Sequence, residues 1–143
     1  IDSLARMPLW KKGLDYRCST GHGVGYMLGV HEGPQRLSTA CNEKLISMMT
    51  LTDEPGVYKE NMYGIRIENH LCVTEAFKTE YGQFLKFEVL NYCPIGTEGF
   101  LPHLLTDEER RWLNDYNEKC RETISPCLSK EEREWLILYT KAI

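Results

Sequence analysis

Five glycines lie within residues 18–34, and this stretch limits the fold of the chain more than any other feature. Glycine weakens regular helices and strands, whereas tight turns and closely approaching backbones favour it. We therefore expect an irregular segment here. His22 is flanked by two of these glycines, Gly21 and Gly23, so that a ligand or a metal ion can come close to its imidazole.

Sequence periodicity around this stretch predicts a helix and an antiparallel sheet. Apolar residues three to four positions apart predict a helix over residues 1–13. Alternation predicts strands over residues 65–73 and 84–90, and a short apolar run predicts another over residues 45–52. The sequence at residues 53–56 is typical of a turn.

Two capping boxes predict a pair of helices near the C-terminal end of the chain. They begin at Thr106 and Ser129, and in each a glutamate follows three positions later, ahead of an apolar stripe. Pro126 separates the two predicted helices. The predicted fold class is therefore α+β: an antiparallel sheet with helices, ending in a helical pair.

Composition and charge argue against two classes of partner. The chain has 143 residues, enough for one domain with its own core, and 42% of them are hydrophobic. Its net charge is −4, with acidic and basic residues interleaved, so we expect no nucleic acid partner. No apolar run approaches the roughly 20 residues that a membrane span needs, and the first residues do not resemble a signal peptide. We expect no membrane contact and a cytoplasmic location.

The cysteines are expected to be reduced. They are Cys18, Cys41, Cys72, Cys93, Cys120 and Cys127. An even number is compatible with disulfides, but none of them forms a Cys-x-x-Cys pair. Without a secretion signal, free thiols are the expected state.

Three side chains have the chemistry of metal ligands. Glu68 lies within a predicted apolar strand, where its carboxylate needs a cation, either Arg66 on the same strand face or a metal ion. The imidazole of His22 and the carboxylates of Glu54 and Glu68 suit a divalent ion such as Mn²⁺, Co²⁺ or Zn²⁺. A pair of such ions activates water for hydrolysis. His31 could then donate a hydrogen bond to a tetrahedral intermediate or carry protons.

Four ordered motifs resemble the signature of aminopeptidase P. They are Thr20-Gly21-His22-Gly23-Val24-Gly25, His31-Glu32-Gly33-Pro34, Asp53-Glu54-Pro55-Gly56 and Gly64-Ile65-Arg66-Ile67-Glu68-Asn69. That family shares the pita-bread fold with prolidase, creatinase and methionine aminopeptidase, and the resemblance covers almost the whole chain. It implies the C-terminal half of the metallopeptidase catalytic domain over residues 1–104. Residues 105–143 are then a C-terminal helical extension of the same domain.

The resemblance also implies a role for each candidate residue. His22, Glu54 and Glu68 match metal ligands, and Glu68 bridges two ions in the full enzyme. Manganese is the expected metal, with zinc or cobalt as alternatives. Catalytic roles fall on Glu54 as general base, on His31 as a contact to substrate near the scissile bond, and on Arg66, which orients the site. The implied reaction is hydrolysis of the N-terminal Xaa-Pro bond of a peptide with proline at the second position, through a metal-activated water.

The chain departs from the family pattern in ways that bear on activity. The family takes two aspartate ligands from a hairpin that would lie before Ile1, and neither Asp2 nor Asp15 matches them. Cys18 stands where the family usually has a histidine. We therefore expect the chain alone to be a poor peptidase, and to form a homodimer or to bind a partner that supplies the missing half. The alternative is a non-catalytic binding or assembly module derived from the same fold.

Overall fold

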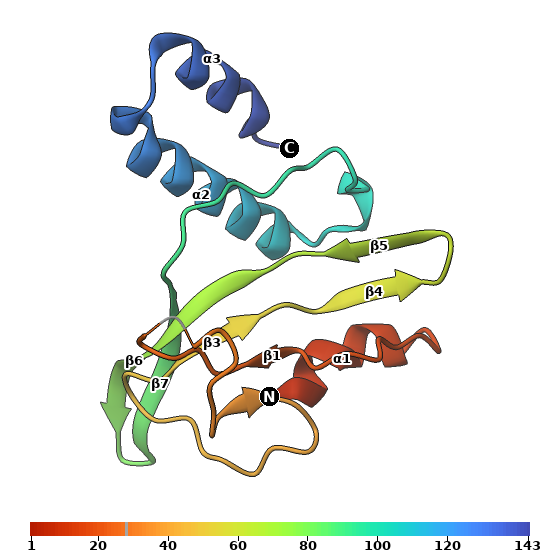
Figure 1. Ribbon diagram of the computed structural model, residues 1–143, viewed down its shortest axis with the longest axis vertical. Coiled ribbons are helices and arrows are strands. Elements are labelled where there is room, and N and C mark those ends of the chain that lie inside the picture. The colour runs from red at the N-terminus through yellow and green to blue at the C-terminus, as the bar shows by residue number, and fades with distance from the viewer. Residues whose placement is uncertain (28) are drawn as a thin grey trace. The chain divides into compact units, whose positions relative to one another are not determined.

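A computed structural model describes residues 1–27 and 29–143 of the chain. These residues form two compact units, Ile1–Asn91 and Tyr92–Ile143 (Figure 1). The first unit contains the strands, all of them in antiparallel pairs, and the second contains a helical pair. The predicted α+β class is therefore confirmed.

The first unit begins with helix α1 and continues into three small antiparallel sheets. Its elements are α1 (Asp2–Trp10), β1 (Gly21–His22), β2 (Arg36–Leu37), β3 (Thr50–Asp53), β4 (Gly56–Lys59), β5 (Tyr63–Arg66), β6 (Asn69–Thr79) and β7 (Gly82–Val89). β1 pairs with β2, and β6 lies between β3 and β7 in a three-stranded sheet. β4 and β5 form a hairpin, which Figure 1 shows as two long arms.

The core of the first unit lies on one face of the three-stranded sheet. Leu37, Leu51 and Val73 pack together there, and Leu51 and Val73 have at most 1% of their surface exposed. Successive residues of a strand point to opposite faces. The burial of Leu51 in this core therefore turns the next side chain, Thr52, to the other face, where the predicted site residues lie.

The single strand predicted over residues 65–73 is in fact two strands. β5 ends at Arg66, and β6 begins at Asn69 in a different sheet. The segment that pairs with β5 and β6 is interrupted at the opposing positions, between β3 and β4, where Pro55 lies. Proline has no N–H to donate to a ladder of hydrogen bonds, so the pairing stops there.

The pairing register nevertheless continues across this interruption. Asp53 pairs with Asn69 before the gap, and Gly56 pairs with Arg66 after it, without any shift in register. Residues 53–56 therefore carry the chain from β3 onward into β4 and do not reverse it. The prediction of a turn at these residues is wrong.

Two other predicted elements are shorter than expected. The strand predicted over residues 45–52 begins only at Thr50. Met48 has a φ of 73°, in the left-handed region that a regular strand does not contain. The helix predicted over residues 1–13 is present as α1, and Gly13, with a φ of 71°, follows its end.

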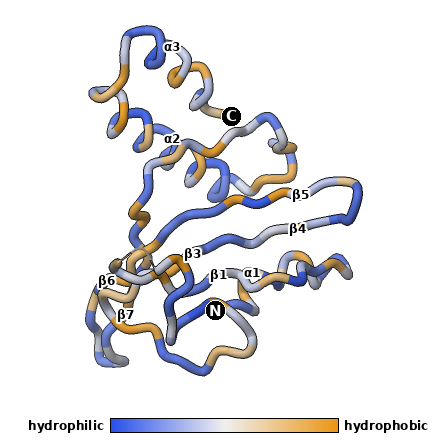
Figure 2. The backbone as a smooth tube through the Cα atoms, viewed as in Figure 1, coloured by the Kyte–Doolittle hydropathy of each residue, from blue (hydrophilic) through white to orange (hydrophobic). Residues whose placement is uncertain are grey.

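The second unit contains the predicted helical pair. Its elements are the 3₁₀ helix η1 (Pro102–Leu104), α2 (Asp107–Ile124), the 3₁₀ helix η2 (Ser125–Cys127) and α3 (Lys130–Tyr139). Both capping boxes are confirmed, because the hydroxyls of Thr106 and Ser129 accept from the backbone N–H three residues later and the glutamates there accept in return. Figure 2 shows hydrophobic and hydrophilic residues alternating along both helices, as expected of helices with one apolar side.

Two further features concern membrane-spanning helices and the state of the cysteines. None of the helices in the described part of the chain is long and apolar enough to cross a membrane. All six cysteines are free thiols, and two of them, Cys72 and Cys120, are buried. Side-chain packing and hydrogen bonds therefore hold the described residues together.

Candidate active site

The predicted ligands His22 and Glu54 meet in the structure. His22 Nε2 lies 3.0 Å from Glu54 Oε1, and about four-fifths of each side chain is buried, with exposed fractions of 20% and 18%. The other ring nitrogen, Nδ1, lies 2.9 Å from the carbonyl oxygen of Gly23. Both nitrogens of the imidazole are thus engaged at defined positions.

These contacts fit a cation between the ring and the carboxylate. The Gly23 carbonyl only accepts hydrogen bonds, so Nδ1 carries the proton of that bond. In a neutral ring Nε2 then presents a lone pair to the Glu54 oxygen, and two such acceptors attract each other only through a proton or a metal ion. A backbone carbonyl on the second nitrogen is also usual for metal-binding histidines. The pair therefore offers two donor atoms of the kind that a divalent metal binds.

Thr52, in β3, connects His22 in β1 with Glu54, which directly follows β3. Its Oγ1 accepts from the backbone N–H of His22 at 3.0 Å and donates to Glu54 Oε1 at 3.0 Å. The two strands approach closely because Gly21 has no side chain. A Cβ at that position would overlap the carbonyl oxygen of Thr52.

Arg66 connects the two predicted carboxylate ligands. Its Nε lies 3.1 Å from Glu68 Oε2, and its Nη1 lies 4.0 Å from Glu54 Oε2. Since the register continues across the interruption, Glu54 and Glu68 occupy opposing positions of the two chain segments. The hydrogen bond to Tyr58 and the nearby carboxylates raise the pKa of Arg66, which therefore remains charged between them.

His31 lies beside His22 at the wall of an open cavity. The centroids of the two rings are 4.1 Å apart, with 47° between the ring planes. The cavity has a volume of about 510 Å³, and His22, His31, Glu54 and Cys18 all line it. The lining thus includes two histidines, two glutamates (Glu32 is the second) and a cysteine, and the space is large enough for part of a peptide.

The three predicted metal ligands are not gathered into one cluster. Among residues 1–27 and 29–143, no group of three His, Cys, Asp or Glu side chains could hold a metal ion. Glu68 is connected to the His22–Glu54 pair through Arg66. The ligand and catalytic roles given to these residues remain predictions.

Sequence reasoning missed two contacts of the site. Alternation in the strand that ends before Glu54 could have pointed to Thr52, because burial of Leu51 turns Thr52 toward the site. Nothing in the sequence marks Tyr58, whose hydroxyl accepts from Arg66 Nη1 at 3.4 Å across the β4–β5 hairpin.

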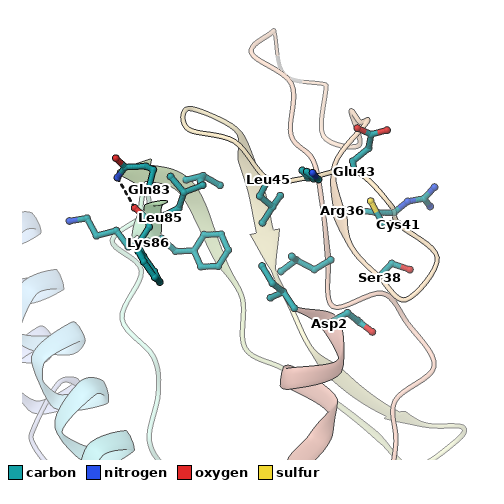
Figure 3. Close-up of a pocket in the computed structure, with 15 residues that line it drawn as sticks. Asp2, Arg36, Ser38, Cys41, Glu43, Leu45, Gln83, Leu85 and Lys86 are labelled. Atoms are coloured by element: carbon teal, nitrogen blue, oxygen red, sulfur yellow. Dashed lines mark hydrogen bonds between the residues drawn. The ribbon is translucent and has the colours of Figure 1, made fainter. Parts of the chain in front are cut away.

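A larger cavity, of about 580 Å³, lies elsewhere in the first unit. Leu45, Leu85 and Asp2 are among its lining residues, and Figure 3 shows the lining drawn from several separate segments of the chain. None of the predicted metal or catalytic residues lines it. The chemistry described above therefore belongs to the smaller cavity.

Comparison with known proteins identifies the family of the chain. Residues 1–75 match the model of metallopeptidase family M24, and residues 83–143 match that of the C-terminal region of peptidase M24. Aminopeptidase P1 of Lotus japonicus is 46% identical over 148 aligned residues, which cover 100% of this chain and 22% of the relative. Aminopeptidase P1 of Arabidopsis thaliana is 45% identical, over 100% of this chain and 23% of the relative.

A solved structure agrees with the fold. The X-prolyl aminopeptidase of Caenorhabditis elegans, described as a cytosolic enzyme with a di-nuclear active site, matches with a TM-score of 0.88 and 40% identity. The match covers 99% of this chain and 24% of that one, so the chain spans about a quarter of the length of its relatives. It confirms the expected C-terminal part of a pita-bread fold. Because the family model matches more than half of the chain, the chain belongs to metallopeptidase family M24.

Proposed function

We propose that this chain is the C-terminal half of the catalytic domain of a Xaa-Pro aminopeptidase, over residues 1–104, with residues 105–143 as a helical extension of that domain. The observation that carries the proposal is the His22–Glu54 pair, whose facing atoms suit a cation between them. The relatives named aminopeptidase P and X-prolyl aminopeptidase support the substrate class. We infer hydrolysis of the N-terminal bond of peptides with proline at the second position.

Each candidate residue has a distinct role in this proposal. His22, Glu54 and Glu68 bind the metal, for which manganese is our first choice and zinc or cobalt are the alternatives. When bound, two such ions polarise the scissile carbonyl and make water a nucleophile at neutral pH. Glu54 accepts a proton from the attacking water, and His31 donates a hydrogen bond to the substrate in the cavity that both residues line. Arg66 holds the Glu54 and Glu68 carboxylates in position.

The proposed site for two ions needs more ligands than His22, Glu54 and Glu68. A second ion requires further carboxylates, and we propose that another segment supplies them, either from a partner or from a longer form of the protein. The β4–β5 hairpin offers apolar surface for such a contact, since Tyr58, Tyr63 and Ile65 are at least half exposed. A second copy of the chain is the alternative partner.

We place the protein in the cytosol, on the description of the C. elegans relative as a cytosolic enzyme. The free thiols are consistent with a reducing compartment. Fractionation of cells that express the tagged protein tests this location, and recovery with secreted material would contradict it.

One observation favours a second candidate, a binding or assembly module without catalytic activity. Cys18 lines the cavity beside His22 and His31, at the position where the family resemblance leads us to expect a histidine. If that histidine is required for turnover, the site retains metal and peptide binding and loses hydrolysis. Measurement of binding and cleavage on the same preparation separates the two candidates.

Metal binding and peptide cleavage test the proposal together. We expect the purified chain to bind Mn²⁺ in a titration calorimeter, and His22→Ala to lose this binding. His103→Ala is the matched control, because His103 is exposed in η1 and contacts no predicted ligand. Equal Mn²⁺ affinity of wild type and His22→Ala would overturn the proposed metal site.

Cleavage is measured on two peptides that differ only at the second position, Xaa-Pro and Xaa-Ala. We expect turnover of the Xaa-Pro peptide once the chain is combined with the upstream half of the domain, and little turnover by the chain alone. Cleavage of both peptides at equal rates would exclude the proposed specificity. Binding of the Xaa-Pro peptide without cleavage in the combined protein would favour the non-catalytic candidate.

A further inference from the structure

A buried charged network connects α1 to the segment that leads into the candidate site. Arg6, with 8% of its surface exposed, donates from Nε to Asp2 Oδ2 at 2.8 Å and from Nη1 to Asp15 Oδ1 at 3.0 Å. It also donates to the backbone carbonyls of Tyr16 at 2.5 Å and Cys18 at 2.7 Å. A buried guanidinium is tolerated only when paired in this way. One side chain thus fixes the backbone over residues 15–18.

The same network extends to Thr20 through its side chain. Thr20, which is 1% exposed, donates from Oγ1 to Asp2 Oδ1 at 2.5 Å. Tyr16 OH lies 2.5 Å from the same Oγ1, and because the Thr20 proton is already used, the tyrosine is the donor. Burial raises the pKa of Tyr16, so its hydroxyl keeps the proton that it donates. Burial also favours protonation of Asp2, but the hydrogen bonds from Arg6 and Thr20 hold its pKa below the usual value.

Thr20 is also where this network meets the candidate metal ligands. The backbone carbonyl of Thr20 accepts from the N–H of Glu54 at 2.6 Å, and its backbone N–H donates to Leu37 O at 3.0 Å. His22 follows two residues later in β1. Both members of the His22–Glu54 pair are therefore attached to Thr20, one by the covalent chain and one by a hydrogen bond.

We propose that Arg6, Asp2 and Thr20 are positioning residues, which set the distance between His22 and Glu54 by fixing the main chain at Thr20. None of the three touches the cavity that holds the pair. They act through the Thr20 carbonyl and the chain on either side of it. The proposal rests on the proposed function in taking the His22–Glu54 pair as the metal site.

Amide hydrogen exchange of the metal-free chain tests this role directly. The reporter is the Glu54 N–H, which donates to Thr20 O, and the reference is the Val73 N–H, which donates to Met49 O in the same unit. Thr20→Val removes the hydroxyl and keeps the shape of the side chain. Loss of a hydrogen bond to a charged group should speed Glu54 exchange about tenfold or more relative to Val73. Thr20→Ser restores the hydroxyl and should restore protection.

Two further variants separate a local effect on the Glu54 N–H from a general loss of stability. Tyr16→Phe removes one donor to Thr20 and keeps the ring under Arg6, so a smaller, severalfold loss of Glu54 protection is expected. Thr79→Val, at the exposed last residue of β6, is the matched control. It likewise removes a hydroxyl that accepts a hydrogen bond, here from the Tyr81 N–H, and it should leave the ratio unchanged. A general loss of stability changes exchange at Glu54 and Val73 by the same factor, and that result would overturn the proposal.

The failure of this proposal and that of the proposed function are distinguishable. Exchange is measured without metal, so an unchanged Glu54-to-Val73 ratio in Thr20→Val refutes the positioning role whatever the chain binds. If the ratio changes as expected, Mn²⁺ titration of Thr20→Val should show affinity about 10- to 100-fold weaker, as is typical when support for a metal ligand is removed. An unchanged affinity beside a changed ratio would refute the link to metal binding. Loss of Mn²⁺ binding in His22→Ala tests the metal site alone.

Discussion

Gly21→Ala tests whether β1 and β3 need a glycine in order to lie side by side. A Cβ at Gly21 would overlap the carbonyl oxygen of Thr52 and lie 2.8 Å from its carbonyl carbon. These are backbone atoms of a paired strand, so they cannot rotate away as the end of a side chain could. Overpacking of this kind costs about 1–3 kcal/mol. We therefore expect the free energy of unfolding to fall by that amount.

Gly99→Ala is the matched control for this variant. A Cβ at Gly99 meets none of the described atoms within 4 Å, and its φ is not positive. There the substitution should stabilise the protein by about 0.4–1 kcal/mol, because alanine lowers the entropy of the unfolded chain. Urea unfolding followed by circular dichroism measures both variants, and their free energies should differ by about 1.4–4 kcal/mol. Equal stability of the two variants would refute the argument from close approach.

Three further predictions concern single side chains or the thiols. Thr52→Val should lower the free energy of unfolding by about 1–3 kcal/mol in urea titrations, because it leaves the part-buried His22 N–H without its acceptor, whereas Thr52→Ser should not. Hydrogen bonds from Thr106 lower the pKa of Glu109, so its stabilising contribution is present above the unfolded pKa and is lost as pH falls through the folded one. Thermal unfolding by circular dichroism should therefore show a smaller loss of stability between pH 7 and pH 3 in Glu109→Gln than in wild type. The intact mass should be identical with and without reductant, and a loss of hydrogen mass without reductant would show disulfides.

Elements that depend on neighbouring residues alone could be predicted from the sequence. The capping boxes at Thr106 and Ser129 formed as predicted, since each is complete within four consecutive residues. The break after Arg66 could not be read from residues 65–73, because its cause is Pro55 on the neighbouring segment. Alternation shows where a strand can form, whereas the partner segment decides where pairing stops.

The candidate site shows the same limit. Glycines beside His22 predicted open space around the imidazole, and alternation predicted that Arg66 and Glu68 share one face of a strand. The strand ends at Arg66, and the two side chains nevertheless form an ion pair at 3.1 Å. The attachment of Glu54 to Thr20, and of Thr20 to α1, joins segments far apart in the sequence. No local pattern carries that information, because it depends on which segments pack together.

The interruption between the paired strands bears on why Glu54 and Glu68 lie where they do. Like charges at opposing positions of an antiparallel pair repel each other and weaken the pairing. Here two carboxylates occupy such positions, in the gap between the Asp53–Asn69 pair and the Gly56–Arg66 pair. The charge of Arg66 partly compensates, but it is about half exposed and 4.0 Å from Glu54, so it cannot neutralise both groups fully. A divalent cation held between the two segments would remove the remaining repulsion. The arrangement that weakens the sheet is therefore the one that the proposed metal ion would stabilise.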